Sequence, residues 1–88
     1  MKLFGIVVAT YPQDRASAIL SSGLSKRAIV SWNSVINSTP KRLDCDDVVE
    51  FDFTQKNGKA IARNIRILSG HEELLMRYRV GAYRRTVR

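Results

Sequence analysis

The chain contains a single cysteine, Cys45, and a single histidine, His71. One cysteine excludes an internal disulfide and a zinc site built from several cysteines, and it fits a reducing compartment. One histidine gives no pairing with serine or cysteine that predicts nucleophilic catalysis, and the sequence has no glycine-rich phosphate-binding motif. The cluster of Asp44, Asp46 and Asp47 lacks further ligands at metal-binding spacing, so we interpret it as a turn. We therefore expect no enzymatic activity, no catalytic residues, no metal and no cofactor.

Long hydrophobic runs are also missing. No apolar stretch approaches the roughly 18–20 residues that a membrane-spanning helix needs. Residues 1–9 combine a lysine with an apolar run, but this run is shorter than a usual secretory signal and has no convincing cleavage region. We interpret it as a buried strand, and we expect a cytoplasmic protein with no membrane partner.

Acidic residues are scarce relative to basic ones. The 88 residues include 15 lysines and arginines against 8 aspartates and glutamates, which gives a net charge of +7. A small protein this basic attracts polyanions, chiefly nucleic acid, or acidic protein surfaces. The hydrophobic content of 44% is ordinary for a globular protein, so the charge belongs to a folded chain. Charge alone leaves a nucleic-acid binder and a protein-interaction module as alternatives.

The clearest local signal in the sequence is a β-hairpin. Val49, Phe51 and Phe53 alternate with polar residues, which is the pattern of a strand with one buried face. Asn57 and Gly58 follow, and this dipeptide favours a tight turn because both residues tolerate positive φ. A second strand-like run begins directly after the turn.

Three further strands precede the hairpin and give five in all. We predict them at residues 2–10, 15–20 and 26–32, with a long connection at residues 33–46 that contains a helical turn or serves function. Five short strands with one longer connection suit a small closed antiparallel barrel of the oligonucleotide-binding (OB) type, and an SH3-like barrel is the alternative. The predicted fold class is therefore all-β, with the barrel in residues 1–68.

Residues 69–88 form a basic extension beyond the barrel. Ser69 and Glu72 fit a capping box, which predicts a short helix from about residue 71 to residue 79 that stops near Gly81. The alternation that begins at Met76 suits a strand equally well, so the extension is predicted as helical or extended. Its last residues are typical of a basic tail that becomes ordered on binding.

Several motifs follow one another along residues 3–68. Residues 46–53 have the form D-D-x-V-x-F-x-F, and residues 62–65 read A-R-N-I after Gly58. These segments resemble the patterns G-D-x-V-x-F-x-V and G-P-x-A-x-N-V of the cold-shock domain family. Residues 3–7 are similar to the opening strand of that family, and residues 29–35 lie where it has F-V-H-F-S-A-I. The resemblance implies a five-stranded OB barrel that binds single-stranded RNA and DNA.

The sequence departs from this family at the aromatic residues that stack on bases. The corresponding positions hold Ala9, Thr10, Ala16, Ala18, Ile29 and Ser31, and only Trp32 keeps a ring. Each lost stacking contact is worth about 1–3 kcal/mol per base. The resemblance therefore implies the fold, while the binding mode does not follow from it.

The altered positions predict an apolar surface that something covers. Ala9, Ala16, Ala18 and Ile29 would lie on one exposed face, and bare apolar surface of this kind usually marks a contact. Our hypothesis is that the extension packs on this face through Leu74, Leu75 and Tyr78. The alternative is that two chains pair through it.

We predict that the chain binds RNA or single-stranded DNA, mainly through charge and with low sequence specificity. A protein-interaction module, or a homodimer formed through the altered face, is the alternative. Trp32 is a candidate for base stacking, although a buried tryptophan is the favoured interpretation. Arginines interleaved with tyrosines in the extension suit RNA. The candidate nucleic-acid-binding residues are Trp32, Arg15, Lys26, Arg27, Lys56, Lys59, Arg63, Arg77, Tyr78, Arg79, Arg84 and Arg85.

Overall fold

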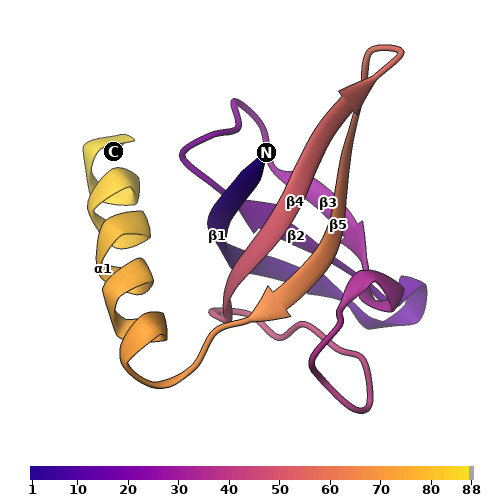
Figure 1. Cartoon of the computed structure of the whole chain (residues 1–88), viewed down its shortest axis with the longest axis horizontal. Coiled ribbons are helices and arrows are strands. Elements are labelled where there is room, and N and C mark those ends of the chain that lie inside the picture. Colours follow the sequence, from indigo (N-terminus) through magenta and orange to yellow (C-terminus); the bar gives the residue numbers. More distant parts are fainter. Residues whose placement is uncertain (88) are drawn as a thin grey trace.

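The computed structural model describes the backbone of residues 1–87 and the side chains of residues 1–79. All five predicted strands are present, and a single helix follows them (Figure 1). The elements are β1 (Lys2–Tyr11), β2 (Ala16–Leu20), β3 (Ala28–Ser31), β4 (Val48–Lys56), β5 (Lys59–Ile67) and α1 (Gly70–Val87). Short 3₁₀ turns at Pro12–Asp14 and Trp32–Ser34 follow β1 and β3, so the predicted helical turn in the long connection lies at its start.

The strands form one antiparallel sheet in the order β3-β2-β1-β4-β5, which curls into a nearly closed barrel. The two edge strands are joined at one end by the segment after β3. There, Val35 bridges Ile65, the Ile36 amide donates to the Ile65 carbonyl, and Asn37 exchanges two hydrogen bonds with the Ile67 backbone. The predicted all-β, five-stranded OB-type barrel is thereby confirmed, in preference to an SH3-like barrel.

The hairpin that connects β4 to β5 is the one predicted from the sequence. Asn57 and Gly58 occupy its turn with φ values of 55° and 79°, the left-handed conformation that this dipeptide tolerates. Val49 and Phe51 point into the core and are fully buried. The period-2 pattern therefore identified the inner face of β4 correctly.

Trp32 belongs to the core, where it is 6% exposed. Its Nε1 donates a hydrogen bond of 2.8 Å to Ser17 Oγ, and Ser17 Oγ in turn donates at 3.0 Å to the Leu43 carbonyl. Both bonds are buried, and they tie β2 to two points of the long connection. The interpretation of Trp32 as a buried residue agrees with this position.

Helix α1 is longer than the sequence predicted. It runs from Gly70 through Gly81 to Val87, so the strand alternative for this segment is wrong. The predicted capping box does not form, because the Glu72 carboxylate accepts two hydrogen bonds from the Arg66 guanidinium instead. The helix starts where β5 ends, and Gly70 takes a left-handed φ of 63° at the junction.

The helix lies beside β1 and β4 (Figure 1). Ile6 and Val48 alternate with the core residues Val7 and Val49, so their side chains face away from the barrel interior. They are nevertheless only 3% and 1% exposed, because α1 covers this outer face. Arg77 fastens the helix there: Nη2 donates to the Asp46 carbonyl at 2.7 Å, and Nη1 lies 3.0 Å from the Asp46 carboxylate.

The hypothesis that the extension packs through its leucines and Tyr78 is therefore wrong. Leu74 and Tyr78 are 64% and 78% exposed, and Leu75 is exposed as well. The half-buried side of the helix instead carries Met76 and Arg77. Ion pairs formed by Arg66 and Arg77 orient the helix, and a sequence pattern based on apolar spacing does not detect them.

Replacing Ile6 tests whether α1 covers the outer face of the barrel. We expect Ile6→Ala to lower the free energy of unfolding by about 2–5 kcal/mol, as for a core isoleucine. Ile29→Ala is the matched control, because Ile29 also faces outward from a strand but is 63% exposed. Urea unfolding measures both variants. Similar losses for the two variants would contradict the helix position.

Ser17→Ala tests the buried hydrogen bonds of Trp32. The substitution leaves the indole N–H and the Leu43 carbonyl without their shared partner, so we expect a loss of about 1–3 kcal/mol in unfolding free energy. Ser22→Ala, at an exposed position after β2, serves as the control. A loss below about 0.5 kcal/mol for Ser17→Ala is the outcome that rules out this role.

Candidate functional site

The outer faces of β1, β2 and β3 form a surface of small side chains. Strand register places Tyr11, Ala16 and Ser31 in one row and Ala9, Ala18 and Ile29 in the next. A β-bulge at Val8 separates these rows of β1 from the preceding pair, Val7 and Ile19. We call these six residues the small-residue face: Ala9, Tyr11, Ala16, Ala18, Ile29 and Ser31.

The small-residue face is open in this chain. Ala18 has no exposed surface, but Ile29 is 63% exposed and Tyr11 40% exposed. Helix α1 lies along β1 and β4 rather than over this face. The predicted cover for the altered positions is therefore not provided by residues 69–79.

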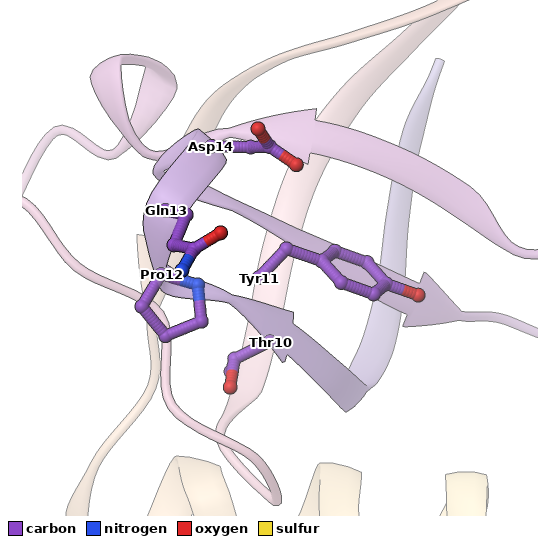
Figure 2. A pocket seen from close by; sticks show the side chains of 5 residues that line it. All are labelled: Thr10, Tyr11, Pro12, Gln13 and Asp14. Carbon is purple, nitrogen blue, oxygen red and sulfur yellow. The ribbon is translucent and has the colours of Figure 1, made fainter.

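Tyr11 stands at the end of β1, where the chain turns through Pro12–Asp14 into β2. Thr10, Tyr11, Pro12, Gln13 and Asp14 line a shallow hollow of about 490 Å³ at this turn. In Figure 2 the Tyr11 ring and the Asp14 carboxylate extend from the turn toward the same side. A flat ring and a charged acceptor thus border one open space.

A second hollow lies where the barrel remains open. The loop before β3 meets the β4–β5 hairpin there and encloses about 380 Å³. We call this hollow the basic groove; its lining residues are Leu24, Ser25, Lys26, Arg27, Ala28, Phe53, Gln55, Gly58 and Ala60. Lys26 and Arg27 are exposed, and neither forms an ion pair within the described part of the chain.

The basic groove and the small-residue face lie on different sides of β3: Ala28, which lines the groove, packs against the core, and Ile29 faces outward. Strand β3 begins at Ala28, directly after Arg27, and Ile29 is the next residue. From Arg27 to Ser31 the chain advances about 13 Å, and from β3 across β2 to β1 is about 10 Å, using standard strand dimensions. An extended ligand that contacts Arg27 at the edge of the groove therefore reaches Tyr11 within a span of two or three nucleotides.

The remaining basic residues of the hairpin lie on its other face. The register pairs Lys56 with Lys59, and Arg63 faces Asp52, so these cations point away from the side that Gln55 and Ala60 give to the groove. All three are exposed. The structure thus brings Lys26 and Arg27 together at the groove. Lys56, Lys59 and Arg63 form a separate row on the opposite side of the β4–β5 hairpin.

Trp32 does not offer a ring to a ligand. The guanidinium groups of Arg15 and Arg42 each lie 5.7 Å from its ring centroid, a distance typical of cation–π contacts. With 6% exposure, the ring has no free face on which a base could stack. Arg15, which has a left-handed φ of 50°, is therefore occupied at one side by the indole.

Of the candidate residues of α1, Arg77 already forms ion pairs within the chain. Arg77 forms ion pairs of 3.0 Å with both Asp46 and Glu73, and these partners raise the pKa of its guanidinium. Tyr78 and Arg79 are exposed. Arg84 and Arg85 belong to the helix backbone, but their side chains lie outside the described residues.

The acidic residues are concentrated in ion pairs away from the groove. Glu50 and Asp52 on β4 pair with Lys2, and Glu50 and Glu72 pair with Arg66. A hydrogen bond from Asn64, together with Lys2, holds the pKa of Asp52 below its usual value, so this carboxylate stays ionised. These pairs neutralise the α1 side of the sheet.

The acidic cluster between the long connection and β4 forms a turn. The Asp47 amide donates to the Asp44 carbonyl, and the Asp44 amide donates to the Asp47 carboxylate at 2.8 Å. Burial raises the pKa of Asp47. In residues 1–79, no group of at least three histidine, cysteine, aspartate or glutamate side chains is placed to hold a metal ion.

Sequence reasoning missed Tyr11, Gln13 and Asp14 as possible contacts. Their segment was interpreted only as a turn, because Pro12 and Asp14 are common turn residues. Arg42 was also missed as a partner of Trp32. The signal for Tyr11 was available in principle: it is the one aromatic residue at the end of β1 beside positions where the cold-shock family has its rings.

A search against models of protein families finds no match to this sequence, and no curated protein matches it significantly. Within the described residues, none of the helical structure is long and apolar enough to span a membrane.

Proposed function

We propose that the chain binds RNA or single-stranded DNA along a path from the basic groove across the small-residue face to Tyr11. The observation that carries this proposal is the position of Lys26 and Arg27, two cations without ion pairs that line a hollow and directly precede β3, the strand whose outer side carries the exposed Ile29 and Ser31. Binding is driven mainly by charge and has low sequence specificity. The resemblance to cold-shock domains supports the same class of ligand.

The distribution of charge favours a polyanion over a neutral ligand. Asp44, Asp46, Glu50, Asp52 and both glutamates of α1 are held in ion pairs. The cations that remain without acidic partners among the described residues include Lys26, Arg27, Lys56, Lys59 and Arg63. Five such cations therefore lie at the groove and the hairpin, and residues 69–88 add five arginines against two glutamates. Phosphate contacts from such cations give affinity without reading sequence.

The shape of the surface favours a single strand. The alanine and serine side chains of the small-residue face are short and project little from the sheet. Bases can therefore approach the backbone of the sheet closely. On the small-residue face the ring available for stacking is that of Tyr11, whereas typical single-strand binders use several. Affinity consequently depends on phosphate contacts and falls as salt rises.

The extension contributes differently from the sequence-based expectation. Arg77 is committed to Asp46 and Glu73, while Arg79, Arg84 and Arg85 remain candidates for additional phosphate contacts. Deleting residues 69–88 would also uncover Ile6 and Val48. Such a truncation tests folding more than binding, so point variants are the better experiment.

Lys26→Ala tests the groove directly. We expect it to weaken binding of a short oligouridylate about threefold to tenfold and to reduce the slope of log K against log salt by about one, as for the loss of one phosphate contact. Fluorescence anisotropy at several salt concentrations measures both quantities. Lys2→Ala removes the same charge from a lysine that pairs with Glu50 and Asp52, so it should leave the slope unchanged.

Two results contradict the proposal. One is wild-type binding that does not change with salt. The other is an equal effect of Lys26→Ala and Lys2→Ala, which would show that net charge matters and the groove does not.

The exposed apolar side of α1 supports a second candidate function, a homodimer that forms through this helix. Leu74, Leu75 and Tyr78 share one exposed side of the helix. Its first turn is acidic, with Glu72 and Glu73, whereas every charged residue from Arg77 onward is an arginine. Two copies in antiparallel arrangement place the basic half of each helix against the acidic start of the other, and their dipoles are antiparallel as well.

The double variant Leu74→Gln, Tyr78→Gln tests this dimer. Three apolar side chains are fewer than a standard interface contains, so we expect weak association, with a Kd of about 10–100 μM. Analytical ultracentrifugation should show concentration-dependent dimerisation of the wild-type chain and a monomeric double variant. Ile36→Gln, at an exposed position on the barrel, should dimerise like the wild type. A wild-type chain that stays monomeric at millimolar concentration excludes the dimer.

A further inference from the structure

The turn after β1 has the features of a binding site for one base. Its hollow of about 490 Å³ is lined by Tyr11, Pro12, Gln13 and Asp14, and the Tyr11 ring and the Asp14 carboxylate extend to the same side of the turn (Figure 2). Tyr11 lies in the same row as Ala16 and Ser31, whose short side chains leave its ring accessible from the small-residue face. The hollow therefore lies at the far end of the path from the basic groove.

Asp14 is the unusual member of this group. Among residues 1–79, its carboxylate forms neither an ion pair nor a hydrogen bond with another side chain, in contrast to the paired acids near α1. A free carboxylate repels phosphate, so it weakens non-specific binding wherever a backbone passes close to it. It stabilises a ligand only where that ligand presents hydrogen-bond donors.

We propose that this turn binds guanine within a single strand, with Tyr11 stacking on the base and Asp14 accepting hydrogen bonds from its Watson–Crick edge. Guanine is the one common base with two adjacent donors on that edge, N1–H and the N2 amino group. A carboxylate binds two adjacent N–H groups in the bidentate manner known from arginine pairs. Gln13 lies beside Asp14, and its amide is able to donate to guanine O6.

The other bases fit the same groups less well. Uracil presents one N–H between two carbonyl oxygens, and those oxygens face the carboxylate unfavourably. Cytosine and adenine each present an amino group next to a ring nitrogen that is itself an acceptor. The carboxylate of Asp14 thus distinguishes guanine from the other bases by the number of N–H donors on the Watson–Crick edge. The Tyr11 ring stacks on any base.

This inference rests on the proposed function, so the experiment separates the two. The probes are a fluorescein-labelled oligouridylate of about eight nucleotides and the same strand with one central guanosine. At low salt, we expect the guanosine to raise the affinity of the wild-type chain about tenfold, which is in the range of one bidentate base contact. Fluorescence anisotropy measures the affinity ratio of the two strands.

Variants assign the effect to the turn. Asp14→Asn offers one donor and one acceptor in place of two acceptors, so it should abolish the preference for guanosine without weakening the binding of oligouridylate. Tyr11→Ala should weaken both strands about tenfold, and Tyr11→Phe should restore them because the ring is kept. Asp52→Asn is the matched control: it removes the same charge from β4, where the carboxylate faces Lys2, and should keep the preference.

The possible outcomes are distinct. A wild-type chain that binds oligouridylate in a salt-dependent way but shows no gain from guanosine overturns the guanine site and leaves the proposed function standing. A preference that survives Asp14→Asn, or is lost equally in Asp52→Asn, also overturns it. Failure to bind either strand overturns the proposed function and the guanine site together.

Discussion

The barrel closes at one end only, and the arrangement of the other features depends on this constraint. Hydrogen bonds from the segment after β3 to Ile65 and Ile67 join the sheet edges at the end where β5 finishes. At the other end the loop before β3 and the β4–β5 hairpin are not joined by strand pairing, and the basic groove occupies the opening. An opening between edge strands exposes unpaired backbone, which natural sheets protect with charged residues. Lys26, Arg27 and the hairpin lysines are placed where such protection is needed, and Lys26 and Arg27 are also the residues that we propose bind a polyanion.

The ion pairs that position helix α1 also determine where the acidic side chains lie. Arg77 of α1 pairs with Asp46, and Glu72 of α1 pairs with Arg66. Acidic side chains therefore lie on the side of the sheet that the helix covers. Each pair is partly exposed, so none contributes much stability alone. Their combined effect is on position: they hold a helix whose leucines point outward, and they leave the cations of the groove and hairpin without acidic partners among the described residues. The burial of Ile6 and Val48 under the helix supplies the apolar contribution that the ion pairs lack.

Local patterns in the sequence predicted the strands well, and they predicted the placement of side chains between elements poorly. The β4–β5 hairpin followed from Asn57, Gly58 and the alternation of Val49 with Phe51, because turn chemistry and period-2 burial are local properties. The docking of α1 did not follow, since it depends on Arg66 and Asp46, which approach the helix only in the folded chain. Leu74 was expected to be buried because it is hydrophobic, yet the ion pairs of Arg66 and Arg77 orient the helix so that this side chain is exposed. The groove required knowledge of which strand edges meet, and no sequence pattern contains this information.

The bulge at Val8 determines which side of β1 its last residues occupy. Val7 points into the core, and in a regular strand every second residue after it would do the same, so Ala9 and Tyr11 would be internal. The extra residue shifts the alternation by one position, and Tyr11 emerges on the outside while Thr10 turns inward beside Ser17. If β1 kept Val8 but ran without the bulge, the regular alternation would insert a phenol among the aliphatic side chains and turn a threonine methyl toward the solvent. A deletion of Val8 would instead give a regular strand in which Ala9 and Tyr11 still face outward, so the loss of this one residue should not bury the ring.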